Sequence, residues 1–176
     1  YSRTLDWALR LVFLVALPAT AALAILAFPL MVALFHYGQF SATDASMASK
    51  SLIAFALGLT GFILVKVLAP GFYARKDTRT PAIIGAIAMM VNALAAVSLA
   101  FTLGHVGLAL ATSLAGIVNA VLLYIRLVSK TGFRPGDGWP AFLVRVSLAT
   151  LIMSALLGFG VAGDLAWLSH SVPKRI

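Results

Sequence analysis

The sequence predicts an all-α polytopic membrane protein, and three observations support this fold class. Of the 176 residues, 62% are hydrophobic and only 10% are charged, with a mean hydropathy of +1.04. Five apolar stretches each reach the roughly 20 residues that a helix needs to cross the hydrocarbon layer. Lys and Arg gather in alternate connections between these stretches. Soluble domains have a different composition and do not show this alternation.

We expect five membrane spans, at residues 7–37, 51–73, 81–103, 106–127 and 140–162. The second span is the clearest, because Lys66 is the one charged residue between Leu52 and Tyr73. A basic turn, residues 75–80, separates it from the third span. Pro18 and Pro29 fall within the first span and Pro70 within the second. Each proline removes a backbone hydrogen bond and favours a kink, although prolines are common in membrane helices.

The charge of the connections predicts the orientation. On one side of the membrane lie Arg3, Arg10, Arg75, Lys76, Arg79, Arg126, Lys130 and Arg134. The other side has Lys50 and, at the Gly104-His105 turn, no Lys or Arg. Basic connections face the cytoplasm. The N-terminus is therefore expected in the cytoplasm, and the residues after the fifth span outside it.

Composition also indicates which partners and activities to expect. The net charge of +8 lies in the connections, where anionic headgroups lie, so we expect anionic membrane lipids as partners and no nucleic acid. The cysteine count of 0 excludes disulfides and thiolate metal sites. Paired carboxylates, metal-binding helices, phosphate-binding loops and nucleophile elbows are missing from the sequence. We therefore predict no catalytic residues, no metal and no cofactor.

Basic residues near the cytoplasmic ends of the spans are the main candidate site. Arg10, Lys66 and Arg145 lie within a few residues of these ends. Their side chains could snorkel to the headgroups. Alternatively, together they could form a vestibule for a substrate that carries phosphate or pyrophosphate on a lipid tail. Both interpretations remain open at this point.

The third and fourth spans carry small residues at every fourth position, which allows two backbones to approach closely. These positions are Ala88, Asn92, Ala96, Ala100, Gly107, Ala111, Ala115 and Asn119. Asn92 could bond across this seam, bind a cation with Thr112 or Ser113, or contact substrate. A role in helix packing is favoured, since such asparagines commonly bond to a neighbouring helix.

Several segments resemble the MurJ (MviN) family of lipid II flippases, within the multidrug/oligosaccharidyl-lipid/polysaccharide exporter superfamily. They are residues 5–10, 17–18, 29–40 and, above all, 66–81, which read KVLAPGFYARKDTRTP. The resemblance implies fourteen membrane helices in two six-helix lobes around a cavity, with two more helices forming a lipid-tail groove. We expect this chain to be a C-terminal-half fragment that corresponds to helices nine to thirteen.

The expected domain organisation follows from this correspondence. Residues 1–127 would form part of the second lobe, and 128–139 a basic cytoplasmic loop. Residues 140–162 would form the first groove helix, and 163–176 an external tail leading to a further helix. The family's principal cavity arginines lie outside such a fragment. Our candidates for substrate binding or gating therefore rest on charge and depth: Arg10, Lys66, Arg75, Lys76, Arg79 and Arg145.

The resemblance implies a lipid II flippase of the bacterial inner membrane, which moves this peptidoglycan precursor to the outer leaflet by alternating access. Implied partners are lipid II, the remaining helices of the full-length protein and cell-wall synthesis proteins. Some relatives bind sodium, and Asn92 and Thr112 could match polar ligands there, but Ala96 supplies no carboxylate. The alternatives are a drug or polysaccharide exporter of the same superfamily and a non-transporting membrane scaffold.

Overall fold

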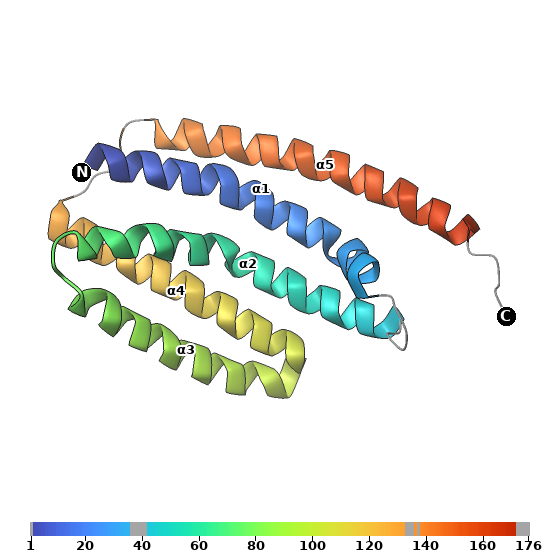
Figure 1. Cartoon of the computed structure of the whole chain (residues 1–176), viewed down its shortest axis with the longest axis horizontal. Coiled ribbons are helices and arrows are strands. Elements are labelled where there is room, and N and C mark those ends of the chain that lie inside the picture. Colours follow the sequence, from blue (N-terminus) through green and yellow to red (C-terminus); the bar gives the residue numbers. More distant parts are fainter. Residues whose placement is uncertain (1, 36–41, 133–135, 137, 172–176) are drawn as a thin grey trace.

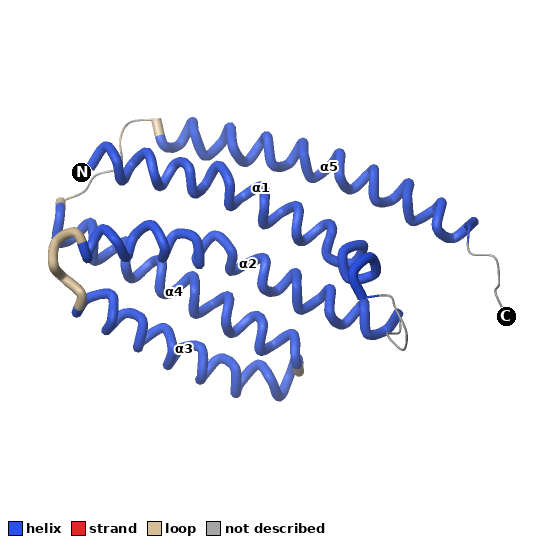
Figure 2. The backbone as a smooth tube through the Cα atoms, in the orientation of Figure 1, coloured by secondary structure: helices blue, strands red, loops and turns tan. Residues whose placement is uncertain are grey.

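Five long helices make up the structure, a computed structural model that describes residues 2–35, 42–132, 136 and 138–171. The helices are α1 (Ser2–Phe35), α2 (Ala42–Tyr73), α3 (Arg79–Leu103), α4 (His105–Thr131) and α5 (Trp139–Ser171) (Figure 1). No strand occurs in the described residues (Figure 2). Each helix contains an apolar stretch long enough to cross a membrane. The predicted fold class of five membrane helices is therefore confirmed.

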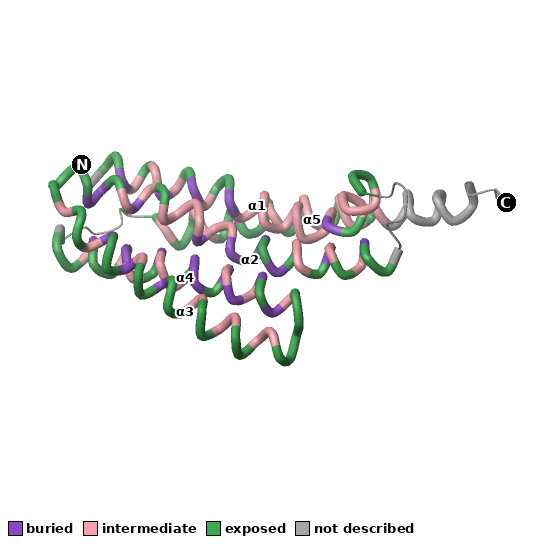
Figure 3. Tube along the Cα trace, turned by 60° about the horizontal axis from the view of Figure 1, so that its bottom comes forward, coloured by how far each residue is buried: buried purple, intermediate pink, exposed green. Residues whose placement is uncertain are grey.

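The helices lie side by side in the order α5, α1, α2, α4, α3 (Figure 1). Among the described elements, α5 packs on α1 alone, and α3 packs mainly on α4. Buried positions follow the sides on which α1, α2 and α4 meet, whereas α3 is largely exposed (Figure 3). The main buried cluster lies near the predicted cytoplasmic end and comprises Leu5, Leu9, Leu68, Phe72, Ile84, Leu123 and Leu127.

The contact between α2 and α4 is very close because small residues face one another. A Cβ atom on Gly61 would lie 2.9 Å from the carbonyl carbon of Gly116. The Ser113 hydroxyl donates a 2.6 Å hydrogen bond to the carbonyl oxygen of Ala54 in this contact. Small residues at helix contacts allow backbone approach in membranes, where apolar burial does not drive helices together. The pair α2–α4 forms the centre of the row.

The predicted hairpin of α3 and α4 is present. Gly104, at φ +58°, joins the two helices, and a Cβ atom on Gly107 would overlap the carbonyl oxygen of Leu99. Ala88 and Ala111, from the two small-residue stripes, are buried. The spacing of four thus corresponds to a close antiparallel contact, as the sequence predicts.

Several boundaries differ from the prediction. The helix α2 begins at Ala42 instead of residue 51, so most of the expected external loop is helical. The loop expected at 128–139 is shorter, because α4 ends at Thr131 and α5 begins at Trp139. Helical backbone in α5 also continues past residue 162 to Ser171. Hydropathy detects the part of a helix that lies in hydrocarbon, and a helix can extend beyond it into the interfacial region.

Prolines do not interrupt the helices. The helix α1 continues through Pro18 and Pro29, and α2 continues through Pro70. Figure 1 shows the last turns of α1 turned away from the axis of its earlier part, and Pro29 lies six residues before the end of this helix. Near Pro70, the N–H of Ala74 donates to the Pro70 carbonyl oxygen at 2.9 Å. The kinks expected at Pro18, Pro29 and Pro70 stay predictions.

We predict that Gly58→Ala lowers the stability of the complete protein. The added Cβ would lie 2.6 Å from Cα of Ser113, so α2 and α4 would have to separate. Overpacking of this kind typically costs about 1–3 kcal/mol. The midpoint of thermal unfolding in detergent, followed by circular dichroism, measures the effect. Gly85→Ala is the control, since nothing lies within 4 Å of its added Cβ; equal midpoints for the two variants would contradict the close contact.

Candidate functional site

The candidate basic residues gather at one end of the bundle. Because successive helices run in opposite directions, this end contains the first turns of α1, α3 and α5 and the last turns of α2 and α4 (Figure 1). Arg10 and Lys66 lie about two turns in from their helix ends, or roughly 10–12 Å along the axis. We refer to this end as the basic end.

Asp6 joins α1 to the beginning of α5. Its Oδ1 atom accepts hydrogen bonds from the backbone N–H of Gly136 at 2.9 Å and from the indole N–H of Trp139 at 2.7 Å. Its Oδ2 atom accepts from Nε of Arg10, also at 2.9 Å. A carboxylate that accepts three hydrogen bonds is well satisfied. We name this group of four residues the Asp6 joint.

Arg10 is part of this joint as well as a candidate site residue. Its guanidinium carbon lies 5.6 Å from the centre of the Trp139 ring and 5.8 Å from that of Phe142, within the range of cation–π attraction. The Trp139 ring also meets Phe13 edge to face, with centroids 5.7 Å apart. The structure thus places Arg10 in a packed contact between α1 and α5.

A second polar joint connects the α2–α3 turn to the end of α4. The Lys130 ammonium donates to Oδ2 of Asp77 at 2.7 Å and to the Thr80 hydroxyl at 2.8 Å. The hydroxyl and the backbone N–H of Thr80 both donate to the Asp77 carboxylate. The hydrogen bond from Lys130, followed by those from Thr80, lowers the pKa of Asp77 from 3.8 to about 2. The Asp77 carboxylate therefore stays charged throughout the physiological pH range.

The other predicted cations lie on the surface of the basic end. Exposed side chains there are Lys66, Arg75, Lys76, Arg79 and Arg145. Arg75 lines a hollow of about 360 Å³ together with Phe72, Asp77, Leu127 and Lys130. The structure gathers these cations at one end, and it does not bring all of them into one pocket.

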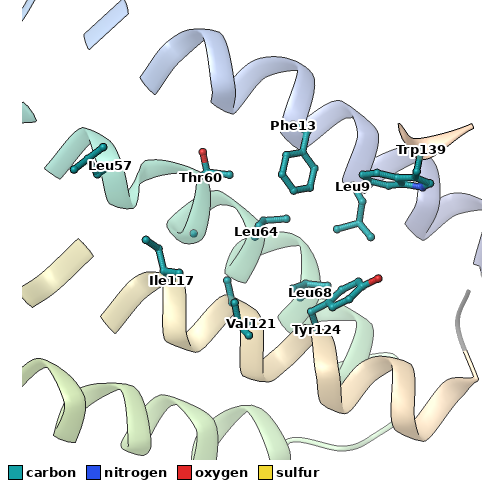
Figure 4. A pocket seen from close by; sticks show the side chains of 12 residues that line it. Leu9, Phe13, Leu57, Thr60, Leu64, Leu68, Ile117, Val121, Tyr124 and Trp139 are labelled. Atoms are coloured by element: carbon teal, nitrogen blue, oxygen red, sulfur yellow. The ribbon is translucent and has the colours of Figure 1, made fainter. Parts of the chain in front are cut away.

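An apolar cavity of about 390 Å³ opens between α1, α2 and α4 (Figure 4). It is lined by Leu9, Phe13, Leu57, Thr60, Gly61, Leu64, Leu68, Ile117, Ala120, Val121, Tyr124 and Trp139. Trp139 belongs both to this lining and to the Asp6 joint, so the cavity reaches the residue on which Arg10 packs. A cavity with this lining suits an apolar chain. The cation Arg10 lies close to one end of the cavity, beside Trp139.

The polar residues of α3 and α4 meet only weakly. The Thr112 hydroxyl lies 3.5 Å from Oδ1 of Asn92 and 3.0 Å from the carbonyl oxygen of Leu108. The hydroxyl has a single proton, which forms the shorter hydrogen bond to Leu108. Its hydrogen bond to Asn92 is therefore weak. Asn119 lies two turns away on α4, and its Oδ1 atom is buried with no hydrogen-bond partner among the described residues. No group of three His, Cys, Asp or Glu residues that could hold a metal occurs in the described part of the chain.

A family model described as lipid II flippase MurJ matches residues 1–176. The chain belongs to the MurJ family. This confirms the resemblance carried by residues 66–81, and it makes the chain a member of a transporter family. Together with the five membrane-length helices, membership indicates a multi-pass protein of the inner membrane.

Similar MurJ proteins are much longer than this chain. It is 37% identical over 175 residues to a probable lipid II flippase MurJ of Vibrio cholerae, covering 99% of this chain and 33% of the relative. It is 40% identical over 176 residues to another of Haemophilus influenzae, covering 100% and 34%. The chain thus spans about a third of the length of these curated relatives.

A solved structure supports the MurJ fold. It is titled lipid II flippase MurJ, inward closed conformation, and it matches with a TM-score of 0.66 and 24% identity. The match covers 92% of this chain and 39% of that chain. At this identity, the likeness shows the fold alone.

Sequence reasoning missed the acids and the tryptophan that form the two joints of this MurJ chain. Asp6 and Arg10 stand four residues apart, and Asp77 and Thr80 stand three apart, so local pairing within each could have been predicted. The partners Trp139 and Lys130 lie 133 and 53 residues along the chain from Asp6 and Asp77. No local pattern indicates such contacts.

We predict that Asp6 and Trp139 are energetically coupled. In a double-mutant cycle with Asp6→Ala and Trp139→Phe, the hydrogen bond should give a coupling energy of about 1.5 kcal/mol, because its acceptor is a charged carboxylate. The cycle is measured as free energies of unfolding of the complete protein in detergent. Trp139→Phe keeps an aromatic ring against Phe13, so the cycle isolates the indole N–H. Additive effects would show that this bond does not hold α5 to α1.

Proposed function

We propose that this chain is part of a lipid II flippase, and that it contributes to moving the precursor across the inner membrane without catalysing a covalent reaction. The observation that carries this proposal is the family match over residues 1–176, together with relatives that are named lipid II flippases. Lipid II joins a long apolar tail to a pyrophosphate. The basic end and the apolar cavity offer complementary surfaces for these two parts.

The cations of the basic end would act by charge. Lys66, Arg75 and Arg145 are exposed and could attract the pyrophosphate, while Lys76 and Arg79 could bind anionic headgroups or help to close the inward gate. Arg10 is already engaged with Asp6 and Trp139, so we assign it to positioning α5 beside the cavity. Transport then requires that substrate stabilise two packings of the lobes to different degrees.

We propose a packing role for Asn92, Thr112 and Asn119. Asn92 and Thr112 face each other across the α3–α4 seam at a distance that gives only a weak bond. Asn119 is partly buried on α4. With Ala96 one turn from Asn92, no carboxylate supports a cation at this place.

We predict that Lys66→Gln, Arg75→Gln and Arg145→Gln together reduce transport. Since a hydrogen bond to a charged group contributes about 1.5–3 kcal/mol, losing even one pyrophosphate contact should lower flipping about tenfold or more. The measurement is lipid II exposed on the outer leaflet of cells in which the variant replaces the native protein, detected with an impermeant lipid II-binding probe.

The matched control is Lys50→Gln, because Lys50 is an exposed lysine of α2 near its opposite end. Normal exposure of lipid II in the triple variant would show that these three cations do not bind the pyrophosphate, and it would not contradict the proposed function. Normal exposure of lipid II after depletion of the complete protein would contradict the proposed function. Transport of a drug or polysaccharide instead of lipid II would favour another exporter, and no transport at all would favour a scaffold.

We propose that the basic end faces the cytoplasm, with the N-terminus inside and the end of α5 in the periplasm. The chain has no cysteines, so single cysteines can report its orientation. Thr78 lies in the α2–α3 turn and His105 at the α3–α4 turn, and both are exposed. An impermeant maleimide applied to spheroplasts should label His105→Cys at once and Thr78→Cys only after permeabilisation. The reverse pattern would invert the proposed orientation.

A further inference from the structure

A crevice of about 200 Å³ runs between α3 and α4 at the basic end, apart from the cavity between α1, α2 and α4. Its lining residues are Thr80, Ile83, Ile84, Ile87, Leu122, Arg126 and Lys130. Arg126 belongs to neither of the two polar joints. No function proposed above uses this crevice.

The lining changes from polar to apolar along the helix axes. Thr80 is the second residue of α3, and Lys130 is the last but one of α4, so both lie at the membrane-surface end. Ile87 lies seven residues further along α3, which is about 10 Å deeper at the rise of a helix. A molecule in this crevice would therefore meet polar groups at the surface and branched aliphatic side chains below.

The crevice opens to the outside of the bundle. Ile83 and Ile87 are 49% and 42% exposed, whereas Ile84 behind them is only 4% exposed. Among the described elements, α3 packs mainly on α4, so its flank is open along this length. Within the described helices this flank is open, so lipid could reach the crevice from the side.

The mouth of the crevice carries one net positive charge, which suits a single anion. Lys130 is paired with Asp77 at 2.7 Å, so this ion pair carries no net charge. Arg126 is exposed at the same mouth and adds one positive charge. Of the three N–H donors of Lys130, two are used within the described residues, on Asp77 and Thr80. One arginine fork and one ammonium donor suit the oxygens of a phosphate.

We infer that this crevice binds an anionic phospholipid of the surrounding leaflet. The phosphodiester would contact Arg126 and Lys130, and one acyl chain would lie along Ile83, Ile87 and Leu122. A soluble phosphate would gain nothing from the aliphatic part, and a zwitterionic lipid would gain little from the net charge. The inference does not depend on which substrate the protein transports.

We predict that Arg126→Gln weakens binding of dioleoyl phosphatidylglycerol to the complete protein about fivefold. A basic residue near an anionic headgroup contributes about this factor. Native mass spectrometry in a zwitterionic detergent, with lipid titrated, counts the bound molecules. Arg3→Gln is the matched control, since Arg3 is an exposed arginine at the same end but outside the crevice, and it should bind as the unaltered protein does.

A second variant tests the apolar half. Ile87→Trp should fill the crevice and reduce binding of phosphatidylglycerol without changing the charge, and dioleoyl phosphatidylcholine should bind weakly throughout. Unchanged phosphatidylglycerol binding by Arg126→Gln would overturn the inference. So would equal binding of the two lipids, which indicates no charge selection, or full competition by glycerol 3-phosphate, which indicates a site for soluble anions. None of these outcomes bears on lipid II transport.

Discussion

The close contact of α2 with α4 is the constraint on which the arrangement of the other helices depends. In lipid, apolar side chains gain nothing by leaving the tails, so helices associate where backbones can approach and polar groups can bond. Gly61 and Gly116 provide the approach, and Ser113 donates to the Ala54 carbonyl within it. With this pair fixed, α1 and α5 lie on one side of it and α3 on the other (Figure 1).

Acidic residues, rather than the more numerous cations, hold the outer helices at the basic end. Asp6 binds the start of α5, and Asp77 binds the end of α4 to the start of α3. Each carboxylate engages one cation, Arg10 or Lys130, and so separates it from the cations that remain on the surface. The basic end therefore combines two structural ion pairs with exposed positive charge. The net charge of the chain does not show which cations are paired and which lie on the surface.

The sequence predicted the five helices and the family because both can be recognised from continuous segments of the chain. Hydropathy over about 20 residues and the run 66–81 need no knowledge of the fold. The beginning of α2 at Ala42 was missed because residues 42–50 are polar enough to resemble a loop and yet remain helical. Likewise, the packing of Arg10 on Trp139 depends on α5 returning to α1, a contact between residues 129 positions apart that composition and local spacing do not encode.

The proposed alternating access would need two packings that differ by only a few kcal/mol. The contacts between the described helices differ in how easily they can be broken, so a change of packing would occur at the weaker ones. The α2–α4 seam brings backbone against backbone, so sliding it would create overlap of the kind that costs about 1–3 kcal/mol per site. The two polar joints depend on hydrogen bonds that water can replace at the membrane surface, so these joints can open more readily. In the proposed transport, a transition would therefore move α5 about the Asp6 joint, while α2, α3 and α4 stay together through their close backbone contacts.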